Sequence, residues 1–351
     1  MIEARAQETL QGLVSCYSPS GREQKAVSYL VTRMQNLGYN RVSIDDAGNA
    51  VGVIGQGSKT LMLLGHIDTV PGEIPVRVED GVLYGRGSVD AKGPLATFVE
   101  AAAGFVSDTW RIMVVGAVGE EADSPGAKYV RDHYTPVEAV VIGEPSQWQR
   151  FTLGYKGSAW MDLQFVQAVA HTASQQTSAC EAAFNTWAAM QQFMHEFNEG
   201  KEKAFEQLQL TLRGFHSDTD GFNENATLTV GSRLPIALPP QEWLKVLQSL
   251  NEDMSVTLLG EPLHAYQAEK NSFLARLFLR GIRAAGEKPG YVYKTGTADF
   301  NLIGPAWNVP MLAHGPGDSA LDHTPNEHIV LEDYYQAIRV LQHVLAGLNE
   351  E

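Results

Sequence analysis

Four short apolar segments of the chain each end in a glycine or a turn that is followed at once by polar residues. Each segment is rich in Val, Ile, Leu or Met, as expected of a buried strand. They are Thr60–Asp68 (TLMLLGHID), Arg111–Glu121 (RIMVVGAVGEE), Val137–Ser146 (VEAVVIGEPS) and Val309–Ser319 (VPMLAHGPGDS). The pattern therefore predicts four strands whose ends carry functional groups.

Helical stretches lie between these predicted strands. The segment 93–105 (GPLATFVEAAAGF) places Pro94 at an expected first helical position. In the segment 124–134 (SPGAKYVRDHY), Ser124 is an expected helix N-cap and Pro125 follows it. Alternating strands and helices indicate an α/β fold, with a sheet covered by helices.

The middle of the chain has a different pattern. A strand-like stretch at 159–169 is followed by a long helical stretch at 178–200, two more strand candidates at 204–215 and 226–234, and a helix at 239–254. The α/β pattern resumes with a helix at 271–286. We therefore predict an α/β catalytic domain formed by residues 1–157 and 270–351, and a small α+β domain, residues 158–269, inserted into it.

Composition limits the function classes. The chain has 351 residues, of which 44% are hydrophobic and 19% charged, which is typical of a globular protein and suggests two domains. Its net charge of −15 argues against a general nucleic-acid binder. Two cysteines, an amphipathic first helix that does not resemble a signal peptide, and the lack of a long apolar run predict a soluble cytoplasmic protein that binds no membrane.

Polar side chains of one chemical kind follow the predicted strands. In open α/β sheets, ligands gather at the carboxyl ends of the strands, so we expect these side chains to meet there. Imidazoles and carboxylates are the ligands that zinc and similar metals prefer. The residues are His66, Asp68, Glu120, Glu121, Glu144, His314, Asp318, Asp322 and His323, with Asp90 from a glycine-rich loop.

Each of these signals also has a simpler interpretation. The adjacent pair Glu120 and Glu121 is typical of a solvated loop, and Asp90 is typical of a turn. A histidine after a strand, such as His66, is more often packed or exposed than bound to a metal. Asp68 strengthens the metal interpretation, because a ligating histidine needs an acceptor for its second ring nitrogen. The cluster as a whole is more specific than its members.

Five motifs resemble those of the di-zinc aminoacylase and carboxypeptidase family, which includes acetylornithine deacetylase and succinyl-diaminopimelate desuccinylase. They occur in order along essentially the whole chain: GHIDTVP, GRGSVDAKGPLA, GEEADSPGA, GEPS and DHTPNE. The segments PGEIPVR and KTGTADFN are most similar to one branch, the hydrolases that release lysine from an amino-group carrier protein, formerly called acetyl-lysine deacetylases. Some members of this branch also release ornithine.

The resemblance implies a mixed-sheet zinc-peptidase fold, an inserted lid and dimerisation domain, and two Zn²⁺ per subunit, for which Co²⁺ can substitute. It places one metal on His66, Asp90 and Glu144, and the second on Asp90, Glu121 and His323. It also implies that Asp68 orients His66, that Glu120 is the general base, and that the Asp90–Ala91 peptide bond is cis.

Amide hydrolysis also needs a donor to the tetrahedral oxygen. The resemblance assigns this role to His171 of the inserted domain, where Ala170 stands in place of the usual preceding glycine. A polar residue at a strand-to-helix corner is the alternative. Candidate substrate-binding residues are Arg233, for a carboxylate, and Lys156, Lys294, Thr295 and Asp299, the last for a distal ammonium. The alternative for Asp299 is a helix N-cap.

We therefore expect a metal-dependent amide hydrolase that releases lysine, or ornithine, from an N-acyl or carrier-protein conjugate in amino-acid biosynthesis. The alternatives are an acetylornithine-type deacetylase or a dipeptidase or carboxypeptidase, and, from another class, a non-catalytic metal-stabilised binding protein. The expected partners are a second copy of the chain and an acidic carrier protein. Docking an acidic carrier on a chain of net charge −15 requires a basic patch, for which the candidates are Arg77, Arg86, Arg150, Lys156 and Lys294.

Overall fold

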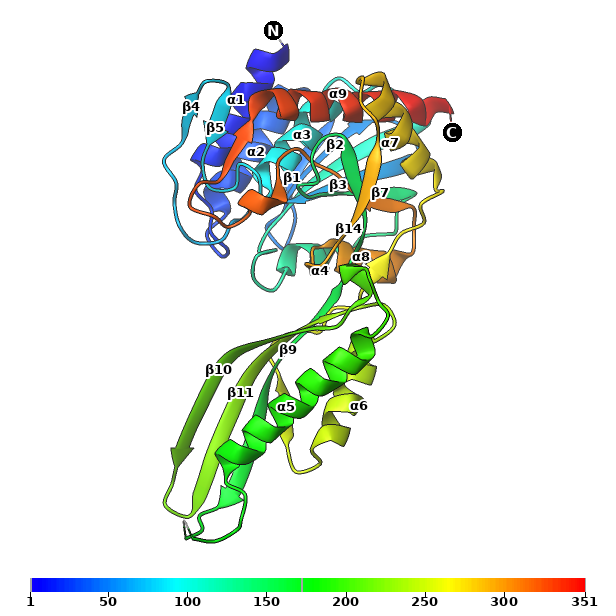
Figure 1. The fold of residues 1–351 in the computed structure, drawn as a ribbon. Helices are drawn as coiled ribbons and strands as arrows, with labels where there is room; N and C mark the ends of the chain where they lie inside the picture. The colour runs from blue at the N-terminus through cyan, green and yellow to red at the C-terminus, as the bar shows by residue number, and fades with distance from the viewer. Residues whose placement is uncertain (1, 172, 351) are drawn as a thin grey trace. The chain divides into compact units, whose positions relative to one another are not determined.

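The computed structural model describes residues 2–171 and 173–350, which form two compact units. Unit 1 comprises the described residues 2–154, 267–293 and 298–350, and unit 2 comprises residues 155–171, 173–266 and 294–297. Figure 1 follows both units along the chain. Within the described residues, no helix is both long and apolar enough to span a bilayer.

Unit 1 is built on a nine-stranded mixed sheet, which confirms the predicted α/β fold class. The strand order is β1-β2-β6-β3-β7-β15-β8-β13, and β14 pairs with β8. Four central strands, β6, β3, β7 and β15, run parallel, whereas β2 and β8 flank them antiparallel. The strands are β1 Arg41–Ile44, β2 Ala50–Gly55, β3 Lys59–His66, β6 Trp110–Ala117, β7 Ala139–Gly143, β8 Arg150–Tyr155, β13 Tyr266–Gln267, β14 Gly290–Lys294 and β15 Met311–Ala313.

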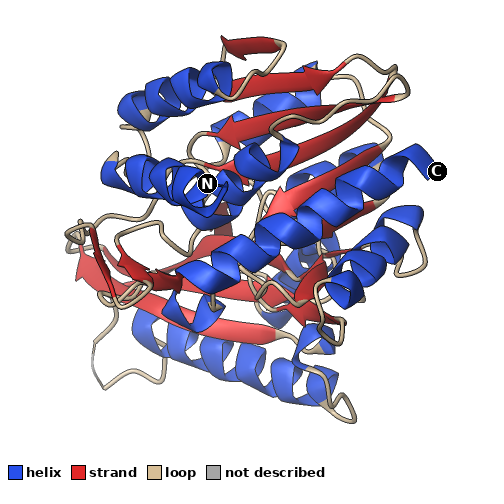
Figure 2. Cartoon of the chain, turned by 90° about the horizontal axis from the view of Figure 1, so that it is seen from above, coloured by secondary structure: helices blue, strands red, loops and turns tan. Residues whose placement is uncertain are grey.

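Helices cover this sheet, as Figure 2 shows in blue beside the red strands. Helix α9 contacts α1, α3 and α7, α1 also contacts α3, α2 packs on β1 and β2, and α4 contacts α8. Their apolar side chains supply the core, and α3 is buried along its whole length. The helices are α1 Ile2–Ser15, α2 Gln24–Asn36, α3 Lys92–Ala102, α4 Pro125–His133, α7 Phe273–Ala284, α8 Phe300–Trp307 and α9 Leu331–Gly347, with short 3₁₀ turns η2 Ser319–Leu321 and η3 Leu348–Glu350.

A row of three glycines lets the helices approach the central strands closely. Gly65 of β3 is the register partner of both Gly116 of β6 and Gly143 of β7. A Cβ at Gly143 would lie 2.9 Å from the Phe98 ring of α3, and one at Gly116 would lie 2.8 Å from the Leu30 side chain of α2. Because α3 begins just after Asp90, this packing holds the Asp90 loop against the ends of these strands.

A second, three-stranded sheet in unit 1 has the order β16-β5-β4. Its strands are β4 Arg77–Glu79, β5 Val82–Tyr84 and β16 His328–Val330, all antiparallel to their neighbours. His328 is the register partner of Tyr84. The pairing therefore joins the segment that follows His323 to the segment that precedes Asp90.

Unit 2 is a four-stranded antiparallel sheet of order β10-β11-β9-β12 packed against two helices. The side chains of Met161, Leu163 and Trp243 lie in its core. Helix α5 begins with a capping box, in which the Ser178 and Glu181 side chains each accept a backbone N–H of the other residue. The elements are β9 Gly157–Ala168, α5 Ala179–Asn198, η1 Ala204–Glu206, β10 Gln209–Thr219, β11 Asn223–Leu234, α6 Pro240–Leu250 and β12 Ser255–Leu258.

Two local details differ from the sequence predictions. Helix α4 begins at Pro125, as the proline predicts, but the Ser124 side chain makes no capping hydrogen bond and its backbone is left-handed, with φ +47°. Helix α3 begins at Lys92, so Pro94 lies two residues past the helix start. Pro125 and Pro94 both still lie in the first turn of their helices, where a proline removes no intrahelical hydrogen bond.

Candidate active site

The candidate ligands lie where the central parallel strands end. Strand β3 ends at His66, β7 ends one residue before Glu144, and β6 leads through Gly119 to Glu120 and Glu121. Because these strands are register neighbours, their last residues share one edge of the sheet. His323 reaches this edge from the loop after η2, with a left-handed backbone at φ +62°.

The structure brings the predicted metal ligands together in two groups that share Asp90. His66, Asp90 and Glu144 have donor atoms within 4.8 Å of one another, and so do Asp90, Glu121 and His323. One Asp90 oxygen lies 3.1 Å from His66 Nε2 and the other lies 3.0 Å from His323 Nε2. His323 Nε2 also lies 3.0 Å from Glu121 Oε1. A carboxylate with one oxygen in each group is suited to bridge two cations. The peptide bond after Asp90 is cis, as the resemblance implies.

The chemistry of this cluster fits divalent metal ions. Burial raises the pKa of Glu120 well above its usual value, and the nearby carboxylates of Asp299, Glu144 and Glu121 raise it further. Such crowding of carboxylates is costly unless positive charge is supplied. Imidazole nitrogens and carboxylate oxygens in two groups of three suit zinc. The residues present therefore fit a two-metal centre.

The pKa values of the two histidines among the candidate ligands are raised. Hydrogen bonds from His323 to Asp90 and Glu121 raise the pKa of His323 to about 10. For His66, burial lowers the pKa, but contacts with Asp68 and Asp90 outweigh it, and the pKa ends well above its usual value. Burial raises the pKa of Asp90, yet the hydrogen bonds from both histidines reverse this and lower it. Protons and metal ions therefore compete for these atoms.

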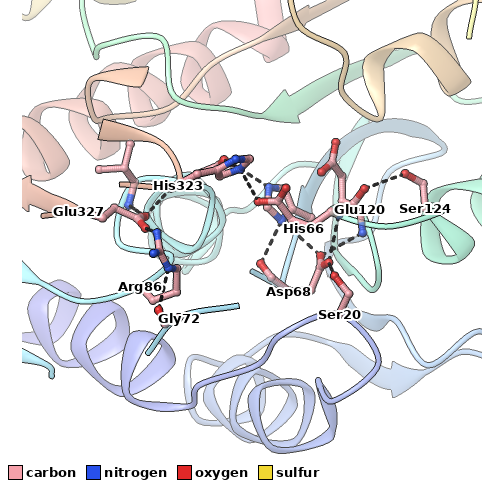
Figure 3. A network of polar contacts seen from close by, with 12 residues as sticks. Ser20, His66, Asp68, Gly72, Arg86, Glu120, Ser124, His323 and Glu327 are labelled. Atoms are coloured by element: carbon pink, nitrogen blue, oxygen red, sulfur yellow. Dashed lines mark hydrogen bonds and ion pairs between the residues drawn. The ribbon is translucent and has the colours of Figure 1, made fainter. Parts of the chain in front are cut away.

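Asp68 contacts both His66 and the backbone of the two adjacent glutamates (Figure 3). Nδ1 of His66 lies 3.1 Å from the Asp68 carbonyl oxygen and 3.4 Å from its carboxylate, so Nδ1 donates and Nε2 is left to bind metal. The same carboxylate accepts the backbone N–H groups of Glu120 at 3.0 Å and Glu121 at 3.1 Å. Ser20 Oγ donates to it at 2.7 Å. Asp68 therefore orients a ligand and also fixes the turn of the two glutamates.

Sequence reasoning missed Ser20 and the backbone contacts of Asp68, because both join segments about fifty residues apart. It also assigned no role to Glu327, although that residue closes the DHTPNE motif. Glu327 is fully buried and accepts hydrogen bonds from the Asp90 loop. The only available signal was its place in a motif that contains a candidate ligand.

The predicted substrate-binding residues are divided between the units. Arg233 and Thr295 belong to unit 2, where Arg233 Nη1 donates to Thr297 Oγ1 at 3.0 Å. Lys294 also belongs to unit 2. Asp299 belongs to unit 1 and precedes α8, but its side chain does not cap the helix. The Asp299 side chain is buried, and burial raises its pKa to about 7.

Lys156 has a different environment from the one that sequence reasoning expected. Its side chain is fully buried in unit 2, and its ammonium donates to the carbonyl oxygens of Ala204 and Gln207 and to Gln209 Oε1. These contacts tie the ammonium to η1 and to the start of β10. A substrate-binding role would require Lys156 to release them, so we do not carry that role forward.

The predicted basic docking patch also needs correction. Arg86 is buried and paired with Glu327 at 2.8 Å, and Lys156 is buried, so neither presents its charge to a partner. Arg77 is exposed, but it stacks on Tyr84 and pairs with Glu79. Sequence reasoning placed these charges on the surface because long cationic side chains are seldom fully buried unless they are paired.

His171 lies in unit 2, and its side chain is exposed. Its Nδ1 accepts the backbone N–H of Ala173 at 3.1 Å. In the neutral ring, Nε2 therefore carries the proton and can act as a donor. This is the protonation state that the predicted role at the tetrahedral oxygen requires.

Comparison with known proteins supports this chemistry. The family model described as Peptidase family M20/M25/M40 matches residues 62–347. The chain is 41% identical to a [LysW]-lysine hydrolase of Deinococcus radiodurans, over 98% of this chain and 97% of the relative. It is 40% identical to a putative [LysW]-lysine/[LysW]-ornithine hydrolase of Thermococcus kodakarensis, over 97% and 92%.

Solved structures show the same fold at low sequence identity. A tripeptidase of Staphylococcus aureus superposes with a TM-score of 0.81 at 18% identity, covering 99% of both chains. An M20 family metallo-carboxypeptidase of Sulfolobus solfataricus gives a TM-score of 0.77 at 16% identity, covering 97% of this chain and 98% of that one.

Proposed function

The chain belongs to peptidase family M20/M25/M40 and is a hydrolase of amide bonds, and we propose that it releases lysine from a conjugate with a carrier protein. One observation carries this proposal. The full-length relatives at 41% and 40% identity are named as hydrolases of LysW-linked lysine or ornithine, and this chain has every predicted ligand and the base in one cluster.

Two zinc ions are proposed to bind to the two groups that share Asp90, with cobalt as a substitute. When bound, such a metal pair lowers the pKa of a water molecule and polarises the scissile carbonyl. Glu120 takes the proton of the attacking water and passes it to the leaving nitrogen.

Unit 2 is proposed to complete catalysis and recognition. The Nε2–H of His171 donates to the tetrahedral oxygen. Arg233 holds the α-carboxylate of the released amino acid through its guanidinium fork. Asp299 is retained as the partner of a distal ammonium, and its buried carboxyl would have to become accessible for that contact.

In the cell, free Cys16 and Cys180 suit a reducing cytoplasm, and recovery of the protein in a secreted fraction would contradict this location.

The alternatives fit less well. Structural neighbours named as peptidases match at 18% identity or less, which supports the fold and not a peptidase substrate. A non-catalytic metal-binding protein is not expected to keep Glu120, since that residue belongs to neither group that shares Asp90. A carrier-linked amino acid remains the preferred substrate.

A hydrolysis panel tests the substrate. We expect the zinc-loaded enzyme to turn over carrier-linked lysine with a higher kcat/KM than carrier-linked ornithine, acetyl-lysine, acetylornithine or succinyl-diaminopimelate. Product amino acid is measured for each substrate at one metal concentration, with the Glu120→Gln variant as the blank. Cleavage of dipeptides alone would contradict the carrier-conjugate proposal and leave only the hydrolase class.

A homodimer is proposed to form through unit 2. Strand β10 is an edge strand, and one side of it pairs with no other strand among the described residues. It exposes Leu212 and Phe215, with 39% and 55% of their surfaces accessible. An exposed edge with apolar side chains is a ready template for pairing with another strand. A second copy of the chain offers a self-complementary partner.

Light scattering coupled to size-exclusion chromatography tests the dimer. The wild-type chain is expected to elute at twice its monomer mass, and Leu212→Asp with Phe215→Asp is expected to shift it toward the monomer, because two buried charges oppose association. Val106→Asp, which changes an exposed apolar residue of unit 1, is the matched control. A wild-type chain that remains monomeric at high concentration would refute the dimer.

A further inference from the structure

Glu327 makes a set of contacts that none of the proposed chemistry uses. Its side chain is fully buried, and Oε1 accepts the backbone N–H groups of Val89 at 2.9 Å and Asp90 at 3.0 Å. Oε2 accepts Arg86 Nη1 at 2.8 Å (Figure 3). One carboxylate therefore holds the backbone on which the shared Asp90 is mounted.

The Glu327 backbone binds the same loop. Gly85 donates its N–H to the Glu327 carbonyl at 3.3 Å, and β16 begins one residue later and pairs with β5. Arg86 is fixed in turn, because its Nε donates to the Gly72 carbonyl at 2.9 Å. The segment from His323 to His328 is thus joined to the segment from Tyr84 to Asp90 by main-chain and side-chain contacts.

These contacts affect the two metal groups differently. His323 lies four residues before Glu327, and its side chain is about half exposed, so its own packing fixes it weakly. Its distance of 3.0 Å from Asp90 therefore depends on how the two segments are joined. In the other group, His66 and Glu144 come from β3 and β7, which hold them through the large sheet.

A buried ion pair is weak evidence for a stabilising role, since an apolar pair of similar volume is often as stable. The Arg86–Glu327 pair is better explained by what it positions. We propose that Glu327 is a positioning residue for the second metal group, because it sets the distance between Asp90 and His323. The proposal rests on the two-metal centre proposed above, and it adds a residue outside the ligand set that decides how tightly the second metal is held.

Zinc titration of the metal-free full-length protein tests this role. The wild-type chain is expected to bind two Zn²⁺. In Glu327→Gln, we expect the affinity of one of the two sites to fall by about 10- to 100-fold, as is usual when a group that orients ligands is lost. The affinity of the other site should change less, because His66 and Glu144 are held by the paired strands β3 and β7. Isothermal titration calorimetry gives both constants without any assay of activity.

Glu100→Gln is the matched control. Glu100 is also fully buried and paired with arginine, with Arg5 at 2.8 Å, but it lies on α3 outside both metal groups. The control variant is expected to lower Tm and to leave both zinc affinities unchanged. A lower Tm alone would therefore not explain the change in zinc affinity that is expected for Glu327→Gln.

The outcomes separate this proposal from the proposed function. Equal weakening of both sites in Glu327→Gln, or no weakening, would overturn the positioning role. A wild-type chain that binds fewer than two Zn²⁺ would overturn the two-metal centre itself. If Glu327→Gln does not fold, Arg86→Lys decides, because lysine keeps the charge and cannot bond both Glu327 and Gly72 in the same way. Selective weakening of the second site is again the expected result.

Discussion

Replacing Glu120 with glutamine is expected to lower kcat by about 10²- to 10⁴-fold while both zinc ions stay bound. Glutamine keeps the size of the side chain and its contacts, but it cannot take a proton from water. Glu120 belongs to neither group that shares Asp90, so the metal donors remain in place. Steady-state kinetics and metal analysis on the same sample measure both parts of this expectation.

The neighbouring residue supplies the control. In Glu121→Gln, the second metal group loses a charged oxygen that lies 3.0 Å from His323, so zinc is expected to be lost along with activity. The two substitutions would then distinguish loss of the general base, in Glu120→Gln, from loss of a metal ligand, in Glu121→Gln. Near-normal turnover in Glu120→Gln would rule out its role as the base, and full zinc retention in Glu121→Gln would remove it from the ligand set.

Removing the metals with a chelator is expected to abolish hydrolysis, and zinc or cobalt is expected to restore it. The affinity of the metal-free protein for zinc should also fall as the pH is lowered. The pKa of His323 is raised to about 10 and that of His66 is also raised, so both rings hold a proton more tightly than an ordinary histidine when no metal is bound. Zinc must displace these protons, and a higher proton concentration therefore opposes binding.

Calorimetry in two buffers of different ionisation enthalpy counts the protons that zinc releases. A positive count at pH 7, together with tighter binding at pH 8 than at pH 6, is the expected result. Full activity after verified metal removal would contradict a catalytic metal. Zinc affinity that does not change with pH would show that neither histidine is a ligand.

The sequence was sufficient to predict those parts of the site that depend on local pattern. The runs before His66, Glu120 and Glu144 are apolar because they are buried central strands, and neighbouring parallel strands end at one edge of the sheet. The positions of the strand ends therefore predicted that the side chains of His66, Glu120 and Glu144 lie close together. The family motifs then supplied Asp90 and His323, which lie in loops that no periodicity describes.

The remaining parts depend on contacts between distant segments. No local pattern indicates that Ser20 donates to Asp68, or that Glu327 accepts the N–H of Asp90. Burial also changed the interpretation of two cations, since Arg86 and Lys156 were expected at a surface and instead bind partners in the interior. The sequence alone does not show whether a charged side chain is solvated or bonded to other groups of the protein.

Every residue of the two groups that share Asp90 belongs to unit 1, whereas unit 2 consists of one continuous insertion and a four-residue turn. Mutations in the insertion therefore change no donor atom of either group. A gene of this design can diverge in one stretch while selection preserves the other.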